Sequence, residues 1–424
     1  MAGLILLALG FMGAGAATWL SSNTADSNVS AVAADPLPAA PAPAVLSAAE
    51  EAFYRDVARD AWAYMETNYV PATGLVKATP DWAYTTVWDV GGQLLAFLSA
   101  REMGLLAEEE YHRRTARLLQ TLEDMRLFRD AAYNKLYSAA DGSMGDAQHS
   151  NGTGWSATDL GRLLVGLKVL SVREPRYAAQ AERIVRRIDM KQVVKDGYVH
   201  GQLIGSTTGR PWTFQEGRIG YEQYVARGFD AWGAKVGNAL SVRIHAQPIQ
   251  IMGVDILADR RKLDRLLSEP FILLGIELGL PQDMQQLAAN VLRVQEARFQ
   301  KTGQITMVSE DAVAVRPSYF YYYCVYCNGK EFVIDISSPG NERNEPRWVS
   351  TKAAFGWHAL MPNEYTEKAL QHVSGAHDSR RGWASGVFEG SGKSTETFDI
   401  NTAAVLLEIA AFQLRGKRPL IHTN

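Results

Sequence analysis

Several features that identify common protein classes are scarce or missing in this chain of 424 residues. Its net charge is only −3, so it lacks the basic surface that nucleic-acid binding requires. Its 8 histidines are scattered without the spacing of a metal site. No Gly-x-Ser-x-Gly motif is present, and no Gly-x-Gly-x-x-Gly motif follows a predicted strand. We therefore predict no cofactor, no metal and no nucleic-acid partner.

Cysteine is almost absent, since only Cys324 and Cys327 occur. Such a pair can form a disulfide or a thioredoxin-like redox site, but redox Cys-x-x-Cys motifs open a helix. Here the pair ends the run Tyr-Tyr-Tyr-Cys-Val-Tyr-Cys-Asn-Gly, which is typical of a strand leading into an Asn-Gly turn. Two ligands cannot complete a zinc site either. We predict a structural role for both cysteines, whether bridged or free.

The start of the chain has a composition unlike the rest. Residues 1–20 are apolar and uncharged, which predicts a signal peptide or a membrane anchor, although no Lys or Arg precedes the run. Residues 21–46 are rich in Ala, Pro and Ser and predict a disordered tether. We expect a periplasmic or secreted protein, with an inner-membrane anchor and a cleaved form both open.

What the chain does contain is a unit that recurs about five times, made of a Gly-rich hairpin, an aromatic-plus-acid cluster and an apolar helix. Long self-similar periods predict stacked or closed repeats. About eleven helices with hairpins between them indicate an all-α fold, an (α/α)6 toroid with short β-hairpins at its rim, over residues 47–418. An open helical solenoid is the competing fold. The units begin at Gly74, Gly152, Gly197, Gly303 and Gly382.

The recurring loops would line the central hollow of such a ring with indoles, phenols and carboxylates, which suits sugar binding. Each aromatic side chain has the alternative of simple core packing, and Glu216 has the alternative of an ordinary surface position. The residues predicted to bind substrate are Trp88, Trp155, Glu216, Tyr221, Tyr224, Trp357 and Trp383.

Glycoside hydrolysis needs two carboxyl groups, one of which donates a proton while the other acts as base or nucleophile. Glu222 is the predicted donor, because it begins an apolar helix between two tyrosines and an apolar wall raises a carboxyl pKa. The helix dipole acts in the opposite direction, and Glu222 has the alternative of an ordinary first-turn acid. Asp89, Asp159 and Glu389 compete for the second role, and the first two have the alternative of helix capping.

Three spaced motifs resemble a known bacterial family, the domain of unknown function 3131. They are Thr85-Thr-Val-Trp-Asp89, Glu216-Gly-Arg-Ile-Gly-Tyr-Glu-Gln-Tyr224, and Glu389-Gly-Ser-Gly continuing to Asn401-Thr402. That family is more distantly similar to glucoamylase-like toroids of glycoside hydrolase family 144, which act on β-1,2-glucan. The resemblance implies an (α/α)6 fold and assigns the acid to Glu222. This sequence departs from the family 144 pattern after Glu222, where Val-Ala-Arg-Gly-Phe stands in place of small residues.

These observations lead to two functional hypotheses. The first is an exported glycoside hydrolase-like protein that cleaves a bacterial β-glucan or exopolysaccharide by carboxylate acid/base chemistry. The second is a non-catalytic envelope protein that binds a polysaccharide in the same hollow. Both take a poly- or oligosaccharide as partner. Two acids that face each other across a cleft would favour the first hypothesis.

Overall fold

The computed structural model describes residues 46–145, 148–205, 209–315, 319–335 and 346–423. The predicted signal peptide or anchor (residues 1–20) and nearly all of the predicted tether (21–46) lie outside these residues. Among the helices of the described ranges, none combines the length and the apolar character needed to cross a lipid bilayer.

Helices dominate the described chain, and most lie where the apolar periodicity predicts them. Their bounds are α1 Ala48–Asn68, α2 Val87–Glu102, α3 Glu108–Asp124, α4 Ala157–Arg173, the 3₁₀ turn η1 Pro175–Tyr177, α5 Ala178–Arg186, α6 Met190–Val193, α7 Tyr221–Asp230, α8 Gly237–Leu240, α9 Glu269–Leu273, the π-helical turn η2 Leu274–Leu278, α10 Gln282–Thr302, α11 Thr351–Leu360, α12 Glu364–Val373 and α13 Ile400–Leu414.

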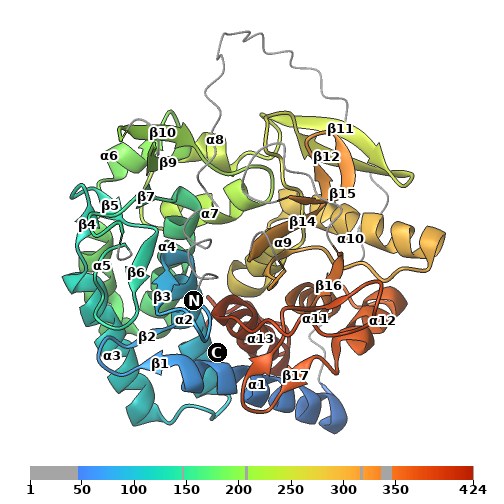
Figure 1. Ribbon diagram of the computed structural model, residues 1–424, viewed down its shortest axis with the longest axis horizontal. Coiled ribbons are helices and arrows are strands. Elements are labelled where there is room, and N and C mark those ends of the chain that lie inside the picture. Colours follow the sequence, from blue (N-terminus) through green and yellow to red (C-terminus); the bar gives the residue numbers. More distant parts are fainter. Residues whose placement is uncertain (1–45, 146–147, 206–208, 316–318, 336–345, 424) are drawn as a thin grey trace.

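Helices α2, α4, α7, α9, α11 and α13 lie toward the middle of the molecule (Figure 1). Helix α2 packs against α4, α4 against α7, α7 against α9, α9 against α11, α11 against α13, and α13 against α2. These inner helices are buried on nearly every face; in α13, for example, all residues from Ile400 to Gln413 are buried. A helix that is apolar all round belongs inside a protein.

The outer helices cover this inner group. Helix α1 packs against α13, α3 against α2, α5 against α4, and α12 against α11, while α10 packs against strands β12 and β14. Helices α3, α5 and α12 bury one face and expose the other. Such one-sided burial is the expected pattern for a surface helix. The inner and outer helices therefore alternate along most of the chain, as the recurring unit predicts.

Glycines let the inner helices approach closely. A Cβ atom added at Gly161 of α4 would lie 2.3 Å from the Val225 Cβ of α7, and one added at Gly228 would lie 2.3 Å from the Gly161 carbonyl oxygen. On the other side of α4, a Cβ at Gly91 of α2 would lie 2.7 Å from the Arg162 carbonyl oxygen. No real side chain fits at such distances, so α2, α4 and α7 pack backbone to backbone.

Short antiparallel strands join the helices. Among the described residues they are β1 Tyr69–Val70 with β2 Leu75–Val76, β3 Tyr84–Thr86 with β6 Leu136–Ser138, β4 Leu127–Phe128 with β5 Ala132–Tyr133, β7 Gly154–Trp155, β8 Val194–Lys195 and β10 Pro211–Gln215 each with β9 Tyr198–Ile204, β11 Ala246–Ile251 with β12 Val254–Asp259, β13 Glu310–Ala312 and β15 Lys330–Asp335 each with β14 Phe320–Cys327, β16 Trp348–Ser350 with β19 Gly386–Phe388, and β17 His377–Asp378 with β18 Gly382–Trp383.

The strand prediction around the cysteines is confirmed, because β14 ends at Cys327 and the Asn328-Gly329 turn leads into β15. Both thiols are free and buried, and burial raises the pKa of Cys324 well above its usual range. The apolar periodicity of residues 258–278 predicts one helix there, and this prediction is wrong in its first half: β12 runs to Asp259, and α9 begins only at Glu269. The intervening residues are mostly charged, and side-chain contacts with distant segments hold them in an irregular loop.

Candidate active site

The first turns of five inner helices meet in one group of polar side chains. Glu269 of α9 accepts a hydrogen bond from the Asn401 Nδ2 of α13 (2.8 Å), and its other oxygen lies 2.6 Å from the Lys352 Nζ of α11. The Trp88 Nε1 of α2 donates to the Asn401 Oδ1 over 3.3 Å. Tyr221 of α7 lies edge-on to Trp88, with ring centroids 5.8 Å apart. The N-terminal ends of α2, α7, α9, α11 and α13 therefore converge on one place.

Strand β13 adds two acids that point to opposite faces of the strand. Glu310 is half-buried and accepts a hydrogen bond from the Tyr221 hydroxyl. Burial, together with the nearby Glu269 carboxylate, raises the pKa of Glu310 to about 7. Asp311 is buried and accepts hydrogen bonds from Trp348 Nε1 (2.8 Å) and Ser350 Oγ (3.1 Å). Burial raises its pKa to about 7 as well, although Lys352 opposes the shift.

Asp89 and Asp159 occupy equivalent positions in the first turns of α2 and α4. Asp89 closes a capping box with Thr86, and Asp159 contacts the N-cap Ser156, as the capping alternative predicts. Burial raises the pKa of Asp89 to about 7, with a contribution from the negative charge of Asp159. Burial also raises the pKa of Asp159. Among the described residues the Asp159 Oδ2 has no hydrogen-bond partner, although it is buried.

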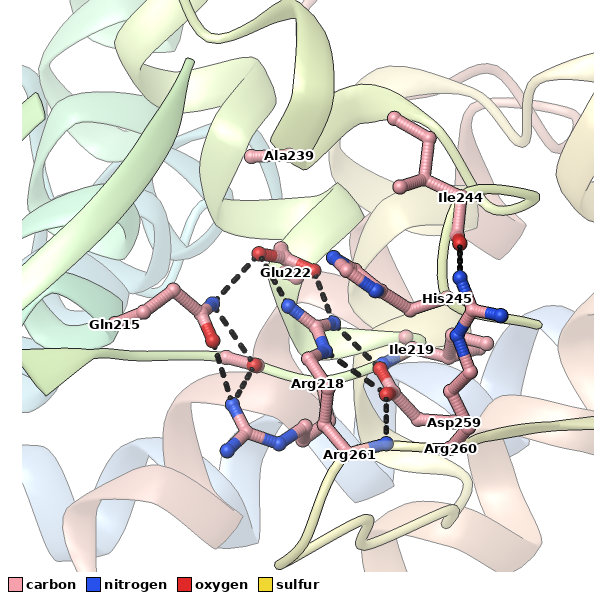
Figure 2. A network of polar contacts seen from close by, with 12 residues as sticks. Gln215, Arg218, Ile219, Glu222, Ala239, Ile244, His245, Asp259, Arg260 and Arg261 are labelled. Atoms are coloured by element: carbon pink, nitrogen blue, oxygen red, sulfur yellow. Dashed lines mark hydrogen bonds and ion pairs between the residues drawn. The ribbon is translucent and has the colours of Figure 1, made fainter. Parts of the chain in front are cut away.

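Glu222, the predicted proton donor, lies in a separate cluster (Figure 2). Its side chain is 1% exposed, and its Oε2 lies 2.6 Å from the Arg261 Nη2. The Gln215 Nε2 donates to its Oε1 over 2.7 Å, and Asp259 shares the same guanidinium. Burial raises the pKa of Glu222, but the Arg261 charge and hydrogen bonds oppose that shift. The apolar pocket between two tyrosines that the sequence suggests is thus replaced by an ion pair.

Glu389 is held in another ion pair. The Arg298 guanidinium donates to both of its oxygens, over 3.0 and 2.9 Å, and the Tyr323 hydroxyl donates over 2.9 Å. Such a two-pronged arginine contact is strong and holds the carboxylate in a fixed orientation. Glu389 therefore joins strand β14 to helix α10. The run Phe388-Glu-Gly-Ser-Gly392 predicts a turn that would expose Glu389, but its side chain is only 6% exposed.

Three of the predicted sugar-stacking tryptophans belong to the core, which corrects their assignment. Trp155 and Trp357 are fully buried, and Trp383 is nearly so. The indole N–H of Trp155 donates to the His200 carbonyl, and that of Trp383 donates to the Val57 carbonyl. A ring without an exposed face cannot stack on a sugar. Trp88 and Tyr221, in contrast, are only partly buried.

Tyr224 is also buried and belongs to a charged cluster behind the site. Its hydroxyl donates to Glu277 Oε2 over 2.6 Å. The fully buried Arg162 guanidinium lies 3.1 Å from Glu408 and 3.5 Å from Glu277, which share a hydrogen bond. It also lies 4.8 Å from the centre of the Trp88 ring. One guanidinium balances one of the two carboxylates, so the pair retains a proton, in keeping with the raised pKa of Glu408.

Glu216 holds the start of α4. Its Oε1 accepts a hydrogen bond from Ser156 Oγ over 2.9 Å, and its Oε2 accepts one from the Ala157 N–H. Burial and the adjacent Asp159 raise its pKa. Glu216 is therefore not a free surface acid: it is partly buried, and its carboxylate is hydrogen-bonded to the start of α4.

Sequence reasoning missed four members of the central group: Glu269, Glu310, Asp311 and Lys352. Glu269 and Lys352 each stand in the first turn of an otherwise apolar helix. The same first-turn signal marks Asp89 and Asp159, and it could have found Lys352. It could not have found Glu269, because the helix predicted over 258–278 places Glu269 in its middle. In the described residues no set of three or more His, Cys, Asp or Glu side chains is arranged to hold a metal ion.

The fold and the site together define a helical protein with an acidic, aromatic cluster at the first turns of its inner helices. The chain belongs to the family described as "Protein of unknown function (DUF3131)", which matches residues 56–416. The membership predicted from the three motifs is thus confirmed. No curated protein matches the chain.

Solved structures resemble the chain over most of its length. A candidate glucoamylase from Bacteroides caccae is 15% identical with a TM-score of 0.62, and the match covers 88% of this chain and 97% of that one. An endo-β-1,2-glucanase from Chitinophaga pinensis, in complex with sophorotriose and glucose, is 13% identical with a TM-score of 0.61, covering 89% and 97%. An endo-β-1,2-glucanase mutant from Talaromyces funiculosus, bound to β-1,2-glucan, is 11% identical with a TM-score of 0.56, covering 86% and 84%. At these identities the likeness shows a shared fold.

Proposed function

We propose that this protein is a glycoside hydrolase-like enzyme whose active site lies at the first turns of the inner helices of an (α/α)6 toroid. The observation that carries the proposal is the group of acids there whose pKa is raised, Asp89, Asp159 and Glu310, beside the partly exposed rings of Trp88 and Tyr221. A hydrolase needs one carboxyl that keeps its proton near neutral pH and a second that loses it. The cycle of helix contacts from α2 to α13 and back to α2 supports the toroid.

Glu310 is the best-suited proton donor in this group. It is partly exposed, its pKa lies near 7, and the Tyr221 hydroxyl orients it. Glu222 suits this role less well, because the Arg261 guanidinium favours its ionised form. Glu310 would protonate the glycosidic oxygen as the bond to the leaving sugar breaks.

Asp159 is the best-suited second carboxyl, with Asp89 as its neighbour and alternative. The Oδ2 of Asp159 has no hydrogen-bond partner among the described residues, so it is free to accept a hydrogen bond from a water molecule. Tyr322 lies near both acids. It hydrogen-bonds with Glu310, and its pKa is raised by burial first, by the charge of Glu310 next, and also by the charge of Asp159. Asp159 would take a proton from the attacking water or attack the sugar directly.

The substrate is proposed to be a bacterial β-glucan or exopolysaccharide. The similar protein from Chitinophaga pinensis holds sophorotriose and glucose, which makes β-1,2-glucan the first compound to test. The apolar run at 1–20 and the Ala/Pro-rich stretch at 21–46 support a location in the periplasm or outside the cell, with or without an anchor in the inner membrane.

The test is to incubate the purified protein with β-1,2-, β-1,3- and β-1,4-glucan and to count reducing ends. Release from one of them, lost in Glu310→Gln and in Asp159→Asn but retained in Glu389→Gln, is the expected result. Glu389→Gln is the matched control, because that acid lies in an ion pair with Arg298 and outside the proposed site. No release from any of the three, with the protein folded, would contradict hydrolysis of a β-glucan.

The second candidate is a non-catalytic protein that binds a polysaccharide at the same place. The observation that favours it is the ion pairing of two of the four acids predicted to be catalytic, Glu222 and Glu389. A protein that retains β-glucan without releasing reducing ends would support this function over hydrolysis.

A further inference from the structure

The β9–β10 hairpin carries an aromatic pair that packing alone does not explain. Trp212 on β10 is 49% exposed, more than any other large apolar side chain of the described residues. Phe214, two positions further along the strand, stacks on it with ring centroids 4.7 Å apart and planes 25° from parallel. Alternate residues of a strand share one face, so both rings lie on the same side of the hairpin. Figure 1 shows this hairpin at the edge of the molecule.

The residue opposite Phe214 is a glycine, which leaves room for the ring. Gly201 of β9 pairs with Phe214, and a Cβ atom at Gly201 would lie 2.8 Å from the Phe214 ring. The same Cβ would lie 2.6 Å from the Glu216 Oε2. Phe214 and the Glu216 carboxylate therefore lie next to one another over Gly201.

From Glu216 the contacts continue to the proposed catalytic group. The Glu216 Oε1 accepts from Ser156 Oγ over 2.9 Å, and that hydroxyl lies 3.0 Å from the Asp159 Oδ1. Strand β9, which carries Gly201, also pairs with β7, and β7 leads directly into α4 and Asp159. The exposed rings are thus linked to the acidic group by a short chain of hydrogen bonds and by one shared sheet.

We propose that Trp212 and Phe214 form an outer subsite that binds a pyranose ring of a β-glucan chain, whose next sugars reach toward Glu216 and Asp159. The choice of a glucan as occupant rests on the proposed function. A pyranose ring has an apolar C–H face and polar hydroxyls at its edge. Its C–H face would lie on the two rings and its hydroxyls would meet the polar groups near Glu216. A single exposed apolar side chain is common on protein surfaces. Here two aromatic rings are stacked on each other next to the Glu216 carboxylate, and this arrangement favours a binding site.

The test compares Trp212→Ala with Trp212→Phe and with a control, Val172→Ala. Val172 is also exposed and apolar, but it lies near the C-terminal end of α4, away from the site. Affinity is measured by electrophoretic retardation in gels that contain β-1,2-, β-1,3- or β-1,4-glucan, in the Glu310→Gln background to prevent cleavage. The expected result is about tenfold or weaker binding for Trp212→Ala, in the range for loss of a buried aromatic anchor. Trp212→Phe should recover part of the affinity, and Val172→Ala should bind as its parent does.

Equal retardation of Trp212→Ala and its parent would overturn the subsite. A parent protein that binds none of the three glucans would overturn it as well. A change in self-association by Trp212→Ala with unchanged glucan affinity would assign the pair to a protein contact and overturn the proposal too. Reducing-end release by the wild-type protein tests hydrolysis separately: retardation that depends on Trp212 without any release would support the subsite while contradicting the hydrolase.

Discussion

If Glu310 is the proton donor, the pH dependence of activity should depend on its neighbour Tyr221. The Tyr221 hydroxyl donates a hydrogen bond to Glu310, and this bond favours the ionised carboxylate. In Tyr221→Phe the bond is lost, so the pKa of Glu310 should rise above its value of about 7. A general acid is active only while protonated, so the alkaline limb of the kcat/KM profile should move to higher pH.

The size of the shift follows from the strength of that bond. A hydrogen bond to a charged group contributes about 1.5–3 kcal/mol, and the lower end applies to Glu310 because it is partly exposed. Since one pKa unit corresponds to about 1.4 kcal/mol, the limb should move from about pH 7 to about pH 8. Glu310→Gln removes the proton altogether and should lower kcat by about 10²–10⁴-fold.

The control for this shift is Tyr224→Phe, one turn further along the same helix. Its hydroxyl also donates to a buried glutamate, Glu277, but that acid belongs to the cluster around Arg162. Tyr224→Phe should lower the thermal midpoint and leave the alkaline limb in place. A limb that stays at the wild-type pH in Tyr221→Phe, or moves to lower pH, would refute the assignment of Glu310. So would a Glu310→Gln protein that keeps most of its turnover.

Three further substitutions test the remaining groups. Glu222→Gln should lower the free energy of unfolding by about 1.5–3 kcal/mol, because Arg261 loses a charge-assisted bond, without moving the alkaline limb. Burial raises the pKa of Asp89 from 3.8 to about 7, so its contribution to stability is full below pH 3.8 and is lost as pH rises toward 7. The thermal midpoint of Asp89→Asn, relative to wild type, should therefore be more favourable at pH 8 than at pH 4, and the opposite order would contradict the raised pKa. Gly161→Ala should cost about 1–3 kcal/mol in urea unfolding through overpacking, whereas Gly237→Ala, whose Cβ would meet no atom within 4 Å, should be nearly neutral.

The sequence predicts the helices well, because their signals are local. Apolar periodicity and N-cap residues such as Thr86 and Ser156 lie within a few positions of each helix start. The β11–β12 hairpin was missed because its turn is Met252-Gly253, which takes positive φ at both residues without the usual Asn-Gly or Asp-Gly signal. The ion pair of Glu222 could not be predicted from such local signals. Its partner Arg261 is 39 positions away, so only the folded chain brings the ion pair together.

Burial of aromatic side chains is a second property that local sequence hides. Trp88 and Trp155 each stand close to the start of a helix, shortly before a first-turn aspartate, and the two segments look alike. In the structure Trp88 is partly exposed beside Tyr221, whereas Trp155 is fully buried and its indole N–H donates to the His200 carbonyl of β9. Whether a tryptophan reaches a site depends on which distant segments pack around it.

The balance of charge at the site explains why its acids keep protons. Helix dipoles at the five converging first turns favour negative charge there, yet burial raises the pKa of the acids at Asp89, Asp159, Glu310, Asp311 and Asp399. Lys352 contacts Glu269 and Asp311. Burial lowers the pKa of Lys352, but the surrounding carboxylates raise it by more, so its ammonium stays charged. One ammonium cannot balance so many carboxylates in a buried setting, so some of the acids must stay neutral near pH 7. A buried site that collects more acids than cations thus holds a transferable proton, which is the property that protonation of a glycosidic oxygen requires.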